Sequence, residues 1–438
     1  NWECSYRYYP VGYGDYLMAY LGSRPARTAV TSDQITDGVV TAAKLATDSV
    51  TTVKIAADNV TTAKIAAANV TTAKLAASSA LVGKNIIHNG AHLVDQRSGD
   101  TRTGFGAAAV FLDDRWKLNV EGSASARWTA SVEADGGVNG SSNWLKMLCT
   151  TADASPGAAE QHHVRQVVEA QNCQPIVSAS GKIAAFAIGV DLALHVDGAS
   201  SISFPAKVAL GVLTYDGTGR QYVEDVLIPA ADTWYRRTVL VPADETGSFP
   251  VDNGSSLALT VALYGGSNVR VATESTWENN ATDTVTANSD NVADATNNYL
   301  GLTNVQLEVG SVATDFEHED YGTTLKKCQR YLWRLLGDTT AYAVAGVYNS
   351  AATTAEGGMR WPNAMRAAPT ITVSAAGDFA VRDTTDQRTV TNFGTTLSSI
   401  YSVRLEITCS GGGLNDGNGS QLVFIDNSGN FFQASAEL

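Results

Sequence analysis

Residues 182–196 read KIAAFAIGVDLALHV, and residues 206–215 read AKVALGVLTY. Both stretches are short runs of apolar residues, and the second ends at the turn sequence DGTG of residues 216–219. Short apolar runs bounded by turn residues are typical of buried β-strands. These two stretches therefore predict that the surrounding region is built from strands.

The same pattern extends to both sides within residues 85–320. Further strands are expected at 125–132, 143–150, 234–241, 256–264 and 299–309. Turn sequences rich in Asp, Asn and Gly separate several of these runs. About seven to nine strands over such a length predict a β-sandwich of the jelly-roll type.

The composition agrees with an all-β protein. Apolar residues make up 44% of the 438 residues and charged residues only 17%. The net charge is −14, and residues 85–320 hold 29 acidic against 13 basic side chains. Nucleic acids and anionic membranes favour a basic protein surface, so neither is expected as a main partner. No apolar run reaches the ~18 residues that a membrane span needs, so membrane insertion is not expected.

The cysteines also limit the possible classes of protein. There are five of them, an odd number, and no CxxC pair occurs. Neither a disulfide framework nor a zinc ribbon is expected from this pattern. The pattern suits a chain that is made in a reducing cytoplasm.

A ten-residue repeat occupies much of residues 31–84. Its copies place Val at the first position and Ile or Leu at the sixth. The eight apolar positions of the four copies are Val40, Leu45, Val50, Ile55, Val60, Ile65, Val70 and Leu75.

These two apolar positions cannot form a core within one chain. On a helix they lie ~140° apart, and on a strand they point to opposite faces. An extended Val-Thr-Thr followed by one Ala-Lys-Ile-Ala turn would bring both inward. Because ordering each residue costs ~1–2 kcal/mol, we expect several chains to wind about a common axis and cover each other. A disordered linker is the alternative.

The repeat resembles the stalk motif of bacteriophage tail fibre proteins. The matching run is VTTVKIAADNVTTAKIAAANVTTAKLA at residues 50–76. The family is homotrimeric, so the resemblance implies an intertwined homotrimeric stalk over residues 31–84.

The middle region resembles the carbohydrate-binding-module-like sandwich of the same fibres. The matching elements are NIIHNGAHLVDQR at 85–97, DDRWKL at 113–118 and LGLTNVQLEVGSVATDFE at 300–317. His92 and Leu93 interrupt the family's usual opening. The resemblance implies the fold of residues 85–320 and transfers no ligand-binding residue.

One short helix is predicted at residues 323–336, inside a connecting segment at 321–337. Thr323 or Thr324 would cap its start. Its apolar stripe follows helical spacing. The stripe consists of Leu325, Cys328, Leu332 and Leu336.

Residues 338–438 are expected to form a smaller C-terminal β-sandwich. They alternate apolar and polar residues at 370–374, 400–408 and 421–425. The segments ATDFEHEDYGTTLKKCQRYLWRL at 313–335 and RWPNAMRAAPTITVS at 360–374 resemble tail fibre segments. This match implies that the C-terminal part is a distal tip.

Residues 1–30 are rich in aromatic side chains and contain helix-breaking Gly and Pro. We interpret them as a segment that docks onto other virion proteins. The docking residues are Trp2, Tyr6, Tyr8, Tyr9, Tyr13 and Tyr16.

Few residues stand out as ligand-binding candidates. Trp277 opens a polar loop that runs to Asn298, and long loops often carry function. Asn415, Asp416 and Asn418 lie in a second polar loop. The remaining tryptophans, which are expected in the core, include Trp116, Trp128, Trp144 and Trp234.

Metal binding and catalysis have weaker support. Asp283, Asp290 and Asp294 are weak candidates for a structural calcium, and no other cofactor is expected. His162 and His163 are adjacent, so on a strand they point to opposite faces and seldom chelate one ion. Established catalytic motifs do not occur in their proper context, so catalytic residues are not expected.

The sequence therefore favours a tail fibre subunit that is not an enzyme. It would be made in the host cytoplasm, join tail or virion proteins at its N-terminal end and bind a host cell-surface glycan or protein at its C-terminal end. A head or tail decoration fibre without a receptor role is the first alternative. A polysaccharide-degrading spike is the second.

Overall fold

The computed structural model describes residues 35, 38, 40–46 and 83–438, with gaps at 98–101, 104, 106–108, 123–125, 135–137, 216–218, 251, 338–342, 385 and 426–428. Residues 1–75 and residues 76–438 form two compact units. The docking residues Trp2 to Tyr16 and the stalk positions Val50 to Leu75 lie outside the described residues.

The described part of the first unit contains one copy of the repeat. A single helical turn, η2 (Ala42–Lys44), follows the first apolar position, and the Lys44 amide donates to the Thr41 carbonyl over 2.9 Å. Val40 and Leu45 are 53% and 45% exposed in the single chain. Both apolar side chains of this copy are therefore exposed.

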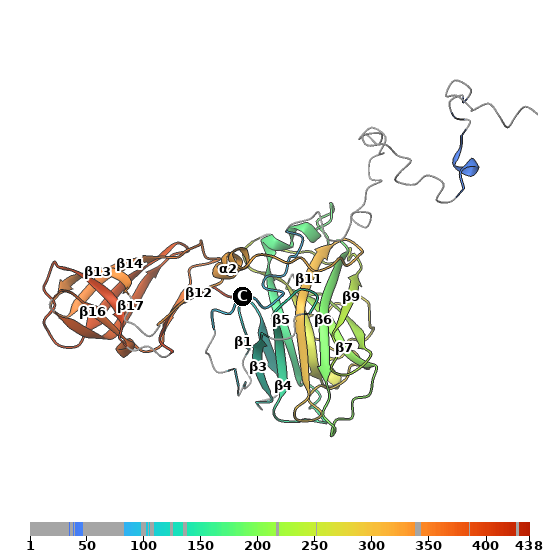
Figure 1. Cartoon of the computed structure of the whole chain (residues 1–438), viewed down its shortest axis with the longest axis horizontal. Coiled ribbons are helices and arrows are strands. Elements are labelled where there is room, and N and C mark those ends of the chain that lie inside the picture. Colours follow the sequence, from blue (N-terminus) through green and yellow to red (C-terminus); the bar gives the residue numbers. More distant parts are fainter. Residues whose placement is uncertain are drawn as a thin grey trace, which may run out of the picture. The chain divides into compact units, whose positions relative to one another are not determined.

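Residues 110–309 form a sandwich of two antiparallel sheets (Figure 1). The six-stranded sheet has the order β1-β2-β5-β10-β7-β8, and the five-stranded sheet has the order β3-β4-β11-β6-β9. The strands are β1 (Val110–Phe111), β2 (Lys117–Glu121), β3 (Trp128–Glu133), β4 (Trp144–Cys149), β5 (Gln161–Glu169), β6 (Phe186–His195), β7 (Ala206–Thr214), β8 (Gln221–Ile228), β9 (Tyr235–Val241), β10 (Ser255–Gly265) and β11 (Tyr299–Val309). The expected all-β sandwich is confirmed.

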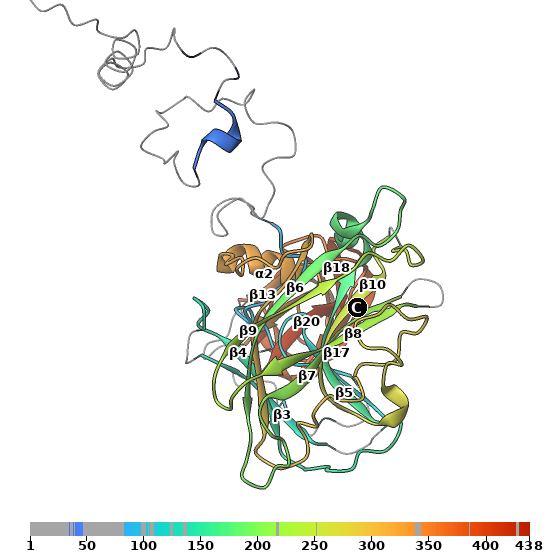
Figure 2. The ribbon, with the colours of Figure 1, turned by 90° about the vertical axis from the view of Figure 1, so that its right-hand side faces the viewer.

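The core of the sandwich lies between the facing sides of the two sheets (Figure 2). Alternate residues along each strand point into it, as the pleat of a strand requires. Leu145 and Met147 of β4 are fully buried, whereas Trp144 and Lys146, which alternate with them, are partly exposed. Two short 3-10 helices, η6 (Ala170–Ile176) and η7 (Ser267–Val269), lie in the connections.

The predicted helix is only half correct. Helix α2 (Tyr321–Gln329) contains Leu325 and Cys328, but Leu332 and Leu336 belong to strand β12 (Leu332–Leu336). The cap is Asp320, whose carboxylate accepts from the Thr323 amide over 3.0 Å, and not Thr323 or Thr324. Pairing of β12 with β20 (Phe431–Ser435) replaces the helical hydrogen bonds in the second half of the segment.

The C-terminal part closes into a barrel where a second, smaller sandwich was expected. Its strand order is β13-β14-β18-β17-β16-β19, and a three-stranded sheet β12-β20-β15 accompanies it. The strands are β13 (Ala343–Ala351), β14 (Thr354–Arg360), β15 (Thr370–Val373), β16 (Phe379–Arg382), β17 (Gln387–Ser398), β18 (Ser402–Cys409) and β19 (Gly419–Phe424), with η8 (Ala376–Asp378) before β16. Closure leaves no unpaired strand edge in the barrel, which a sandwich would have to protect.

Hydrogen bonds and ion pairs join the sandwich to residues 330–331 and to Glu437 near the C-terminus. The carboxylate of Glu169 in β5 accepts from the Arg330 guanidinium over 2.6 Å and from the Tyr331 hydroxyl over 2.7 Å. Glu437 forms ion pairs with Arg97 and Arg115. Among the described residues, no helix is long and apolar enough to cross a membrane.

Candidate functional site

The outer face of the five-stranded sheet carries the candidate site. Its residues are the members of each strand that alternate with core residues, so they point away from the other sheet. The strand register sets Lys146 of β4 beside Gly301 of β11, and Gly301 beside Ala193 of β6. In the next row, Leu148 lies beside Tyr299, and Tyr299 lies beside His195.

Four aromatic rings gather on this face. The ring centroids of Trp144 and Trp234 lie 5.4 Å apart at 79°, an edge-to-face arrangement. Tyr299 lies 6.1 Å from Trp144 and stacks on His195, with 4.9 Å between centroids and 10° between ring planes. All four side chains are partly exposed, so the cluster is a surface feature and not part of the core.

Gly301 leaves the space that the two indoles occupy. A Cβ atom at this position would lie 3.0 Å from ring atoms of both Trp144 and Trp234. Any larger residue would therefore push the rings away from the sheet. The glycine allows the indoles to lie close over the strands as a platform.

Polar groups surround the rings. The ammonium of Lys146 lies 4.6 Å from the centroid of the Tyr299 ring. Asp232 pairs with Nδ1 of His195 over 2.7 Å, and Glu133 accepts from the Ser131 hydroxyl over 2.5 Å. Burial, followed by the Asp232 carboxylate, raises the pKa of Tyr299, so this phenol stays a neutral donor.

The neighbouring row of the face is partly paired, since among the described residues Asp191 Oδ1 and Arg236 Nη2 have no hydrogen-bond partner. Asp191 is fully buried and accepts from Asn304 over 2.7 Å and from Asn139 over 3.1 Å. Arg236 donates to the Asn304 carbonyl over 2.6 Å. Burial lowers the pKa of Arg236, and the nearby Asp191 opposes that shift. This row supports the platform and offers few free groups.

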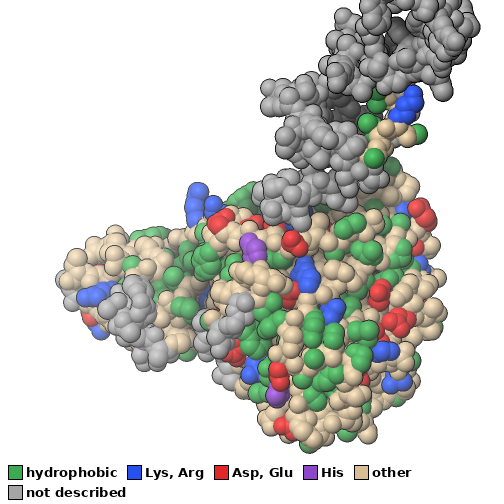
Figure 3. All heavy atoms as spheres, turned by 45° about the vertical axis from the view of Figure 1, so that its right-hand side comes forward, with side chains coloured by type: hydrophobic (Ala, Val, Ile, Leu, Met, Phe, Trp, Pro, Cys, Tyr) green, Lys and Arg blue, Asp and Glu red, His purple; other side chains and the backbone are tan. Residues whose placement is uncertain are grey.

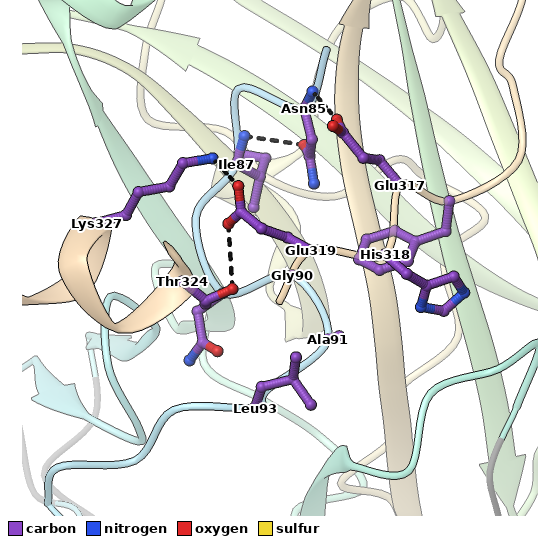
Figure 4. A pocket seen from close by; sticks show the side chains of 12 residues that line it. Asn85, Ile87, Gly90, Ala91, Leu93, Glu317, His318, Glu319, Thr324 and Lys327 are labelled. Carbon is purple, nitrogen blue, oxygen red and sulfur yellow. Dashed lines mark hydrogen bonds and ion pairs between the residues drawn. The ribbon is translucent and has the colours of Figure 1, made fainter. Parts of the chain in front are cut away.

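Two hollows elsewhere are less suitable for a sugar. A cavity lies where residues 85–93 meet 316–327, and Figure 4 shows the side chains that line it. Its volume is about 30 Å³, which is room for about one water molecule. Its charged groups are already paired, Glu319 with Lys327 over 2.6 Å and with the Thr324 hydroxyl over 3.1 Å. A shallow hollow of about 680 Å³ on the barrel, between Gly357 and Arg404, has no aromatic ring among its lining residues.

The structure places the ligand candidates from the sequence elsewhere. Trp277 packs against the sandwich core and Tyr222, and its Nε1 donates to the Pro242 carbonyl over 2.8 Å. Asn415, Asp416 and Asn418 are exposed in the loop between β18 and β19. Their role in binding stays a prediction.

The three candidate calcium ligands take part in separate hydrogen-bond networks. Asp283 accepts from Gln221 and Asn280, Asp290 accepts from the Lys207 amide, and Asp294 accepts from Ser200, Ser201 and Asn298. No cluster of three or more metal-ligating side chains occurs in the part of the chain that the structure describes. The four described cysteines, Cys149, Cys173, Cys328 and Cys409, are buried and free.

Sequence reasoning missed the platform because it assigned all strand tryptophans to the core. Trp116 and Trp128 are indeed fully buried, but Trp144 and Trp234 are on the outer face. The available signal was the alternation in WLKMLC at 144–149, where Trp144 shares a face with Lys146 and Leu145 shares one with Met147. A lysine on the same face as a tryptophan indicates the solvent side of a strand.

Comparison with known proteins gives no family. No family model matches the chain, and no curated protein matches it. Among solved structures, TmCBM61 in complex with β-1,4-galactotriose is 10% identical with a TM-score of 0.24, covering 52% of this chain and 99% of that one. The CBM22-1 xylan-binding domain from Paenibacillus barcinonensis Xyn10C is 14% identical with a TM-score of 0.22, covering 49% and 100%. At TM-scores below 0.5, neither likeness establishes a function for this chain.

Proposed function

We propose that this chain binds a saccharide on the outer face of the five-stranded sheet. The observation that carries the proposal is the cluster of Trp144, Trp234, Tyr299 and His195, four partly exposed rings on one face. One face of a sugar ring consists of C–H groups, which pack on aromatic rings, while its hydroxyls require hydrogen-bond partners. Lys146, Glu133 and Asp232 supply donors and acceptors around the rings.

The surface of the sandwich suits such a ligand in general. Figure 3 shows hydrophobic side chains mixed with acidic, basic and histidine side chains on the exposed surface. An aromatic group with polar neighbours is the usual composition of a binding patch on a soluble protein. An open face of this kind suits a chain of sugars, which can lie along it.

We further propose that the chain is a subunit of a bacteriophage tail fibre that attaches the virion to a host surface glycan. The decapeptide repeat and the tail-fibre-like segments at residues 85–97, 313–335 and 360–374 support this role. Trimeric assembly would place three platforms on one fibre. Because linked sites raise the effective concentration of each other, weak binding at each platform would suffice for attachment.

The test is a printed glycan array probed with the labelled full-length chain, followed by titration of the best-bound oligosaccharide. Trp144→Ala and Trp234→Ala should each weaken binding about tenfold, or ~1.4 kcal/mol, because each removes a stacking surface. Tyr401→Ala is the matched control, since Tyr401 is 64% exposed on the barrel, away from the sheet. Circular dichroism checks that each variant is folded.

Two results would contradict the binding proposal. One is a full-length chain that retains no glycan from the array. The other is folded Trp144→Ala and Trp234→Ala chains that bind as tightly as the unmodified chain. Binding of whole host cells that disappears with Tyr401→Ala but not with Trp144→Ala would move the site to the barrel.

A further inference from the structure

We infer that the saccharide taken by this face is acidic, and that the ammonium of Lys146 recognises its negatively charged group. This inference rests on the proposed function and adds the chemical class of the ligand. It depends on the position of Lys146 among the rings and on the state of the other charged groups of the face.

Lys146 is central on the platform. Its strand neighbours in the same row are Ser131 of β3 and Gly301 of β11, and the indoles of Trp144 and Trp234 lie over Gly301 beside the lysine. The ammonium lies over the Tyr299 ring at 4.6 Å from the centroid. A sugar stacked on Trp144 and Tyr299 would therefore lie within reach of this cation.

The ammonium has no anionic partner of its own. Within the described residues, no hydrogen bond or ion pair joins Lys146 to another side chain, and its one recorded contact is the Tyr299 ring. Several other cations of the sandwich are in ion pairs, among them Arg127 with Asp153 and Arg220 with Asp244. All three N–H donors of Lys146 thus remain for a ligand.

The acidic groups of the face each have at least one polar partner. Asp232 pairs with His195, Glu133 accepts from Ser131, and Asp191 is held by Asn304 and Asn139 with Arg236 3.9 Å away. Lys146 is therefore a cation beside the rings whose donors are free among the described residues, while Glu133, bonded to the neutral Ser131 hydroxyl, remains an anion on the same face. The free ammonium of Lys146 is complementary to a negative ligand group.

The cost of desolvation favours an anion over a neutral hydroxyl. A ligand that covers Lys146 removes water from the ammonium, and a buried charge without a counter-charge is unfavourable. A carboxylate or sulfate at hydrogen-bond distance restores the lost interaction with a charge-assisted bond. A hydroxyl restores only part of it.

The net negative charge of residues 85–320 disfavours an anionic ligand, but it acts over a longer range than the contact with Lys146. Residues 85–320 carry 29 acidic and 13 basic side chains, which repel an anionic polymer at a distance. At physiological ionic strength, charges more than ~8 Å apart are largely screened, whereas a contact pair on a partly buried face is screened less. The local pair therefore decides the binding once the sugar is in place.

The experiment compares acidic polysaccharides with their neutralised forms on the full-length chain. The probes are polygalacturonate with its carboxyl-reduced form, alginate with its carboxyl-reduced form, and chondroitin sulfate with its desulfated form, each measured by affinity electrophoresis. We expect at least one acidic form to bind about tenfold to a hundredfold more tightly than its neutralised form. The pair that shows the difference tells a carboxylate from a sulfate.

Variants of the lysine then test its role. Lys146→Gln should remove the preference for the acidic form, and Lys146→Arg should retain most of it, because arginine keeps the charge. Lys207→Gln is the matched control, since Lys207 is a partly exposed strand lysine of β7 in the other sheet. It should bind like the unmodified chain.

The outcomes separate this inference from the proposal on which it rests. Suppose that the chain binds neutral glycans, that Trp144→Ala abolishes this binding and that Lys146→Gln leaves it unchanged. The binding platform is then supported, and the acidic ligand is wrong. If acidic and neutralised forms bind equally, the inference is likewise overturned. If neither form binds and the glycan array is also empty, the proposed function fails first.

Discussion

At the residue scale, His162 shows how a titratable side chain can belong to the core. Nε1 of Trp128 donates to its Nδ1 over 2.8 Å, and the Tyr264 hydroxyl lies 3.1 Å from its Nε2. Burial, with a smaller contribution from Arg127, lowers the pKa of His162 to about 4. The neighbouring His163 is also buried. Both histidines are therefore packed inside the sandwich.

The lowered pKa of His162 predicts that the protein loses stability in acid. In the unfolded chain His162 has a pKa near 6.5. Its full contribution to the free energy of unfolding is therefore present above pH 6.5. As the pH falls from 6.5 toward 4 the unfolded state binds a proton first, and stability drops by up to ~3 kcal/mol. Urea unfolding at pH 7, 5.5 and 4.5 measures the drop.

The comparison variant is His162→Gln, which has no imidazole to protonate and should lose less stability over the same pH interval. His318→Gln, at an exposed position, controls for the removal of a histidine. If His162→Gln and the unmodified chain show the same pH dependence, the buried neutral histidine is not its source.

At the element scale, the conformation of the segment after α2 is determined by its partner strand. The stripe of Leu325, Cys328, Leu332 and Leu336 suits a helix, but residues 332–336 pair along their whole length with β20. In that strand Leu332 is fully buried and Leu336 is 38% exposed. Short apolar runs fit the period of a helix as well as that of a strand, and here the pairing with β20 selects the strand.

These two leucines form a matched pair for a test. Leu332→Ala should cost ~2–4 kcal/mol because it empties a buried position, whereas Leu336→Ala should cost less than ~1 kcal/mol. Thermal and urea unfolding of the two variants give the values. Equal costs would instead indicate that both leucines lie on one buried stripe, as in a continuous helix.

At the scale of the whole molecule, we expect the repeat to assemble with other copies of the chain. Val40 and Leu45 are about half exposed in the single chain, although they occupy the apolar positions of the repeat. Covering such side chains would yield ~25 cal/mol per Å² of apolar surface. Assembly through the repeat would recover that free energy.

Light scattering tests the assembly directly. We expect the full-length chain to have about three times its mass of 46.0 kDa, and residues 85–438 to be monomeric. A trimeric 85–438 fragment would show that the sandwich or barrel also holds the chains together. A monomeric full-length chain would contradict the stalk and leave the repeat as a linker.

The all-β class was determined by the sequence itself. Strands β6, β7, β10 and β11 lie within a few residues of the expected ranges, because continuous apolar runs between turns have few other solutions. Strands β2, β5 and β8 were missed, since polar residues such as His163, Arg165 and Glu224 interrupt their apolar pattern. Loops and chain segments that cover the outer face of their sheet bury several of these polar positions.

The candidate site, the barrel and strand β12 were decided only by the tertiary structure. Period-two alternation shows that a strand has two faces, but not which face the second sheet covers. That choice buries Trp128 and leaves Trp144 beside Lys146 on the surface. Likewise, closure of β13 to β19 and pairing of β12 with β20 join residues about 70 to 100 positions apart, and local pattern carries no information at that separation.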